Sequence, residues 1–148
     1  MSDTPRQTQA GDKMETTKIS IVVDGHKEQA KLQYDAAKIF IIFTMKNGFR
    51  KKYESEDLYL CLAKIRHDLP HIKFLCKGSK LNVTPSRMCS QMSGGFVAYE
   101  LTMGKSATFN DIVHIFNYEE NDIAQTLEEQ KAFYKAWLQS LNTEQPEN

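Results

Sequence analysis

The sequence predicts a single α+β domain, in which β-hairpins form an antiparallel sheet and helices pack on it. Two turn signals, Asp24-Gly25 and Asn47-Gly48, each lie between strand-like segments in the first third of the chain. Helical patterns come only after those strands, and a length of 148 residues suits one domain with a real core. We assign the domain to residues 17–142, between a flexible polar tail (1–16) and a frayed C-terminus (143–148).

Four consecutive antiparallel strands are expected to open the domain. Residues Lys18–Val23 and 29–34 alternate between apolar and polar side chains, which is typical of half-buried strands. Ile39–Met45 is apolar on both faces and predicts a central strand that is covered at least in part on both sides. The segment Phe49–Tyr53 returns as the fourth strand and carries three consecutive basic residues.

A helix should follow, with Ser55 as its N-cap and Pro70 as its end. Its apolar residues recur at helical spacing on one continuous face: Leu58, Cys61, Leu62, Ile65 and Leu69. Arg66 falls near its C-terminal end, where a cation is favoured by the helix dipole. The segment His71–Cys76 then predicts a fifth strand.

The second half should hold a short helix, two strands and a long helix. Thr84-Pro85 begins the short helix, which runs to about Met92 and is terminated by Gly94-Gly95. Phe96–Met103 and Asp111–Phe116 are the two strands.

Thr126 and Glu129 form a capping box that begins the last helix. Its apolar stripe consists of Phe133, Tyr134, Trp137, Leu138 and Leu141. We expect this stripe to dock the helix on the domain.

Charge and composition exclude several classes of protein. Nineteen basic residues balance nineteen acidic ones, so nothing predicts bulk attraction to nucleic acid or to a membrane surface. Residues 17–116 carry a net charge of +6 and residues 117–148 a net charge of −5, which makes a basic body and an acidic C-terminal segment. The longest apolar run is far shorter than the roughly 20 residues of a membrane span.

The chain has the features of a cytoplasmic protein without a catalytic site. Its polar first sixteen residues do not form a secretory signal, and three cysteines are an odd number that predicts reduced, buried thiols. No glycine-rich phosphate loop and no GxSxG motif is present. The spacing of Cys61, His67, His71 and Cys76 is no standard zinc pattern, so we expect neither a metal nor a cofactor.

Two segments are candidate contact surfaces. Arg87 and Gln91 share one face of the predicted short helix, and Met92 follows beside them. The methionines of this helix suit either core packing or an adaptable contact with a partner, and the pattern leaves both open. The second candidate is the acidic segment that includes Glu119, Glu120 and Asp122, whose carboxylates could pair with a basic groove.

A basic cluster marks the second hairpin. Lys46 and the run Arg50–Lys52 are interleaved with Phe49 and Tyr53, which could stack on bases of a nucleic acid. Lysines also protect an edge strand from pairing with other chains, and this explanation is favoured.

Two stretches resemble a known family. Met92–Lys105 leading into Asp111–Phe116, together with Glu128–Leu141, resembles a family of small uncharacterised bacterial proteins found beside secreted polymorphic toxins, as in Rhs or type VI secretion loci. The resemblance covers roughly the C-terminal third to half of the chain and includes no known catalytic residue. It implies a cytoplasmic immunity protein that binds and neutralises a cognate toxin domain. The alternative is a small nucleic-acid-binding module that uses the basic hairpin.

Overall fold

The computed structural model describes residues 14–143 and contains an α+β domain with two antiparallel sheets. The larger sheet has the strand order β5-β4-β3-β2-β6, and the smaller sheet has the order β7-β8-β9. The predicted fold class is therefore confirmed. Most of the predicted tails, residues 1–13 and 144–148, lie outside the described residues.

The four predicted hairpin strands form in sequence order. They are β2 (Glu15–Val23), β3 (His26–Asp35), β4 (Phe40–Thr44) and β5 (Arg50–Glu54), each pairing antiparallel with the next. The first turn has positive φ at Asp24 (51°) and Gly25 (81°), as a type I′ hairpin requires. Strand β2 begins at Glu15, two residues before the expected domain boundary, because Glu15 already pairs with Tyr34.

Helix α1 (Leu58–Asp68) covers one face of this sheet, where it contacts β4 and β5. The core between them is closed by large side chains without solvent exposure: Ile21, Leu32, Ile41, Phe43, Leu58, Leu62 and Ile65. The predicted cap is wrong by two residues. The side chain of Asp57, not Ser55, accepts the hydrogen bond from the backbone N–H of Leu60, because Asp57 is the residue directly before the helix.

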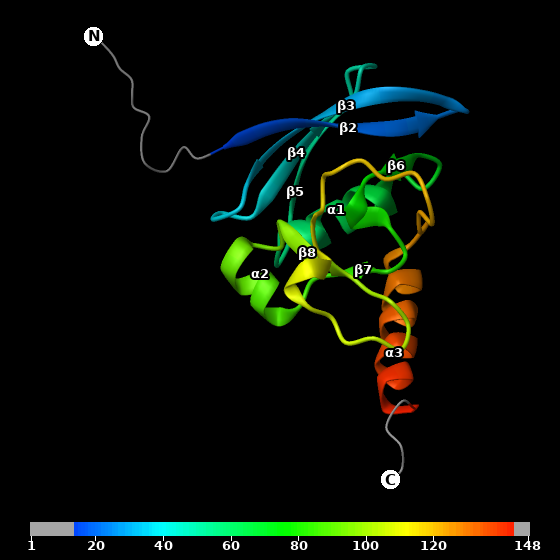
Figure 1. The fold of residues 1–148 in the computed structure, drawn as a ribbon. Coiled ribbons are helices and arrows are strands. Elements are labelled where there is room, and N and C mark those ends of the chain that lie inside the picture. Colours follow the sequence, from blue (N-terminus) through cyan, green and yellow to red (C-terminus); the bar gives the residue numbers. More distant parts are fainter. Residues whose placement is uncertain (1–13, 144–148) are drawn as a thin grey trace.

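The opposite face of the five-stranded sheet has no helix on it among the described elements. Figure 1 shows the helices α1, α2 and α3 on the same side of the sheet. The prediction that β4 is covered on both sides holds only in part, because its outward residues Phe40, Ile42 and Thr44 are half-buried by neighbouring side chains. The Lys52 ammonium, for example, lies 4.5 Å from the centroid of the Phe40 ring.

The second half is made of short elements. Strand β6 (Lys73–Leu75) pairs with β2 at the edge of the sheet, and a 3₁₀ turn, η2 (Lys77–Ser79), leads to β7 (Val83–Thr84). Helix α2 (Arg87–Ser93) precedes β8 (Val97–Glu100), which pairs with β9 (Ile112–His114) after the turn η3 (Phe109–Asp111). Both predicted strands are thus shorter than expected.

Helix α3 (Leu127–Thr143) ends the described chain. Its predicted capping box is confirmed: the Glu129 N–H donates to the Thr126 hydroxyl, and the Thr126 N–H donates to the Glu129 carboxylate. Only part of its apolar stripe is covered, since Trp137 is 8% exposed whereas Tyr134 and Leu138 are exposed. No helix within residues 14–143 is long and apolar enough to cross a membrane.

Candidate contact surfaces and a buried arginine

Helix α2 presents two methionines to solvent. Met88 is 54% and Met92 79% exposed, and only Cys89 of the three apolar residues in this helix is buried. Arg87 and Gln91 are exposed as well, so the four side chains form one outward stripe, which we call the α2 face. Core packing, one of the two explanations that the sequence left open, therefore does not account for Met88 and Met92.

The α2 face is joined to α1 through Asp57 and two glycines. One carboxylate oxygen of Asp57 accepts from Leu60 at the start of α1, and the other accepts from the Ser90 hydroxyl of α2 at 2.7 Å. The Leu58 N–H donates to the carbonyl of Gly94 at 2.6 Å. A Cβ on Gly95 would stand 2.8 Å from the Asp57 side chain, so glycine is required by the close approach of the two segments.

The acidic candidate set does not act as one surface. Glu119 is 8% exposed, and its carboxylate binds the ammonium groups of Lys77 at 2.9 Å and Lys80 at 3.1 Å. Both lysines also pair with Glu100, which completes a four-residue ionic network. Burial alone would raise the pKa of Glu119, but the hydrogen bonds from Lys77, from the Asn121 N–H and from Lys80 outweigh it and lower that pKa to about 2.

The other two members of the acidic set remain on the surface. Glu120 is exposed and accepts a hydrogen bond from the Tyr118 hydroxyl, and Asp122 is exposed with a positive φ of 57°. Glu119 therefore has a structural role, and only Glu120 and Asp122 are available to a partner.

The uncovered face of the large sheet is basic. Cross-strand pairing places Lys18 opposite Lys31, Lys31 opposite Thr44, and Thr44 opposite Arg50, in one row across four strands. The three cations are exposed, and none forms an ion pair with a described carboxylate. Like charges directly opposite each other destabilise a sheet, so this row is a feature that folding alone does not favour.

The two aromatics that are interleaved with the basic residues of the second hairpin, Phe49 and Tyr53, point inward. Tyr53 is buried and donates its hydroxyl to Asp68, and Phe49 packs edge-on against Phe43 in the core. Lys51 pairs with Asp68 at 2.8 Å. The interleaved aromatics therefore point inward and are not placed to stack on bases, while β5 is indeed an edge strand of the sheet.

The cysteines are buried thiols. Cys61, Cys76 and Cys89 are all free and buried, and burial raises the pKa of Cys61 to about 11 and also raises the pKa of Cys76. Within residues 14–143 no three His, Cys, Asp or Glu side chains are placed to hold a metal ion.

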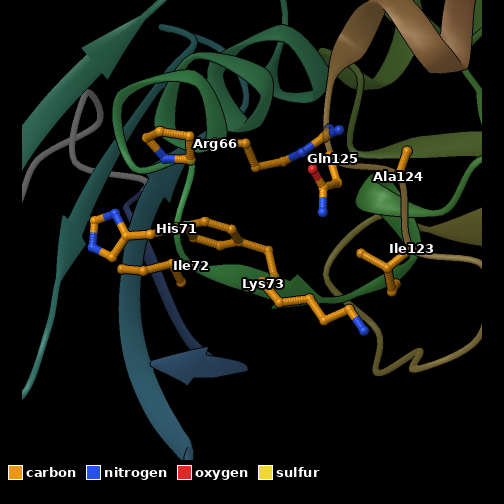
Figure 2. Close-up of a pocket in the computed structure, with 9 residues that line it drawn as sticks. Arg66, His71, Ile72, Lys73, Ile123, Ala124 and Gln125 are labelled. Carbon is orange, nitrogen blue, oxygen red and sulfur yellow. The ribbon is translucent and has the colours of Figure 1, made fainter. Parts of the chain in front are cut away.

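A pocket that the sequence did not reveal lies between α1, β6 and the segment before α3. Its walls include Arg66, His71, Lys73 and Gln125, and its volume is about 130 Å³. Figure 2 shows the Arg66 side chain reaching from α1 toward the segment that contains Ala124 and Gln125. Arg66 is 4% exposed, and burial lowers its pKa, although a guanidinium stays charged in proteins.

Sequence reasoning missed the roles of Asp57, Arg66 and Gln130. Gln130 is buried at the start of α3, where its carbonyl accepts from Arg66 and its amide donates to the backbone carbonyls of Gly78 and Lys80. In the sequence, a glutamine on a charged helix does not indicate that it is buried. The one feature that could have suggested a contact is its position one turn after the capping residue Thr126.

Comparison with known proteins gives no match, either to a protein-family model or to a curated protein. The resemblance to the toxin-associated family thus stays a prediction, and the proposed function rests on the surfaces of the structure.

Proposed function

We propose that this protein is an immunity-type binding protein, which neutralises a cognate toxin domain by direct protein contact through the α2 face. The exposure of Met88 and Met92 on a helix that is fixed to the domain carries the proposal. Exposed apolar side chains beside an arginine are typical of contact surfaces, since methionine adapts to a partner and arginine anchors it.

The rigid support of the α2 face favours the same conclusion. Asp57 joins α1 and α2 through two hydrogen bonds, so the stripe is ordered before any partner arrives. A preorganised surface loses little conformational entropy on binding, which favours high affinity.

Co-expression with any toxin domain found to be encoded beside this gene tests the proposal. The wild-type protein should protect the cells and should co-elute with the toxin domain in size-exclusion chromatography. Met92→Asp should weaken the complex at least tenfold, because it places a carboxylate in the centre of an apolar contact. Met103→Asp is the matched control, since Met103 is an exposed methionine outside α2. If the wild type neither binds nor protects, the function is wrong; if both variants bind normally, the α2 face is wrong.

A second candidate function, nucleic-acid binding, is favoured by the cationic row Lys18, Lys31 and Arg50 on the open sheet face. The inward-pointing Phe49 and Tyr53 do not support it, so it depends mainly on phosphate contacts. It predicts an affinity for generic RNA that falls steeply with salt and that is reduced by Lys31→Gln. Binding that is insensitive to salt would exclude it.

A further inference from the structure

Arg66 is a buried cation that has no counter-charge among residues 14–143. Its Nη1 donates to the Oε1 of Gln130 at 3.0 Å, whereas its Nη2 has no hydrogen-bond partner and no contact with solvent. No carboxylate within residues 14–143 forms an ion pair with it. Buried charges in proteins are normally paired, so an unpaired guanidinium at 4% exposure is unusual, and the part of Arg66 that lines the pocket is the part that a ligand can reach.

The arginine is held in place by a neighbour that cannot neutralise it. Gln130 donates its amide to the carbonyls of Gly78 at 3.0 Å and Lys80 at 2.8 Å, which fixes its own carbonyl toward Arg66. The guanidinium is therefore preorganised by a neutral group. Two carboxylates of α3, Glu129 and Glu128, act on Arg66 only from a distance, and Glu129 is engaged by the Gln125 and Thr126 N–H groups.

The space beside Arg66 suits a small anion. The pocket of about 130 Å³ is roughly ten times what a single water molecule needs (~10–15 Å³). Two further groups that can carry positive charge, Lys73 and His71, line it, and no acidic side chain does. Lys73 forms no ion pair with a described residue, so its ammonium is also free to bind.

We propose that this pocket binds a small oxyanion, a carboxylate or a phosphoryl group, which pairs with Arg66 and Lys73. The guanidinium offers the planar donors that both kinds of oxyanion accept, and the lysine adds a point charge. This site is separate from the α2 face and does not depend on the function proposed above.

Titration of the whole protein with phosphate, and separately with acetate, tests the proposal. Chloride keeps the ionic strength constant, and the readouts are the melting temperature and the ¹H–¹⁵N signals of the arginine guanidinium groups. At least one of the two anions should raise the melting temperature in a saturable way and shift the Arg66 signal. A response to phosphate indicates a phosphoryl ligand, and a response to acetate indicates a carboxylate ligand. An increase that never saturates would show only the general stabilising effect of salts and would overturn the site.

Two variants make the test specific. Gln125→Glu places a carboxylate at the pocket, so it should abolish the saturable effect; Gln125 is exposed, and we expect the fold to tolerate the change. Lys73→Gln should weaken the affinity about tenfold, and Lys135→Gln on the exposed side of α3 is the matched control. Equal anion dependence in the wild type and in Gln125→Glu, or in Lys73→Gln and Lys135→Gln, would contradict the proposal.

Discussion

The two halves of the domain share one apolar core but differ in how much polar contacts add to it. From β2 to α1, strands joined by short turns bury a continuous apolar core in which residues such as Phe43 and Leu62 have no exposed surface. From η2 to α3, regular structure is sparse; Val83, Ala98 and Ile115 extend the same apolar core, and polar contacts join the segments in addition. The ionic network of Lys77, Lys80, Glu100 and Glu119 is the clearest of these.

The contacts of the second half are also more distant in sequence. The Gln130 amide binds carbonyls about fifty residues earlier, and the Trp137 indole N–H donates to the Lys105 carbonyl at 2.9 Å. In the second half, specific hydrogen bonds therefore add to a smaller share of the apolar core. Such a region should respond to pH and to single polar substitutions, whereas the first half should respond to lost volume.

The largest effect is expected in the apolar half. Phe43→Ala should lower the free energy of unfolding by about 4–5 kcal/mol, because it leaves a cavity beside Phe49 and Phe74 in a region without solvent. Urea unfolding monitored by circular dichroism measures this change. A loss below about 2 kcal/mol would mean that the sheet repacks and that the contrast between the halves is overstated.

Trp137→Ala should cost about 3 kcal/mol, since the ring is buried on the domain but its helix is only partly covered. Trp137→Phe separates the two contributions: it keeps most of the apolar area and removes the hydrogen bond to Lys105. The phenylalanine variant should therefore lose about 1 kcal/mol. If both variants keep wild-type stability in the same denaturant melts, α3 does not dock through this residue.

The junction between the halves gives a smaller effect. Gly94→Ala should destabilise by about 1–3 kcal/mol, because Gly94 has a φ of 63° and an added Cβ would collide with the Ala36 carbonyl. Gly25→Ala is the control, since Gly25 also has a positive φ but nothing lies within 4 Å of the added atom. Equal losses in both variants would show that the close approach at Gly94 does not matter.

The polar half should show the pH dependence. The pKa of Glu119 is about 2 in the folded protein and below its ordinary value of 4.5, so its contribution is complete above about pH 4.5. That stability is lost as the pH falls from there toward 2. Glu119→Gln should cost about 2 kcal/mol at pH 7 and should flatten this dependence, so that both proteins converge near pH 2. Parallel curves for the two proteins, from urea melts between pH 2 and pH 7, would exclude the role assigned to Glu119.

Part of the candidate site could be predicted and part could not. The sequence placed Arg87, Gln91 and Met92 on one helix, and the structure has them there. It could not decide which side of a seven-residue helix faces the core, because Met88, Cys89 and Met92 are all apolar and cover too few turns to define a stripe. The tertiary contacts of the helix end decide its orientation. Gly94 packs against Ala36 and Gly95 against Asp57, and in this orientation Cys89 faces the core.

The sequence by itself determined the hairpins, the course of α1 and the start of α3, because turn chemistry, capping and apolar periodicity act between residues a few positions apart. Only the tertiary structure decided which charged residues are exposed. Glu119 looks like any carboxylate of an acidic segment until Lys77, 42 residues earlier, lies beside it, and Arg66 looks like a solvated helix end until Gln130 covers it. The sequence does not show whether a charged side chain is buried, because the segments that surround it come together only in the folded chain.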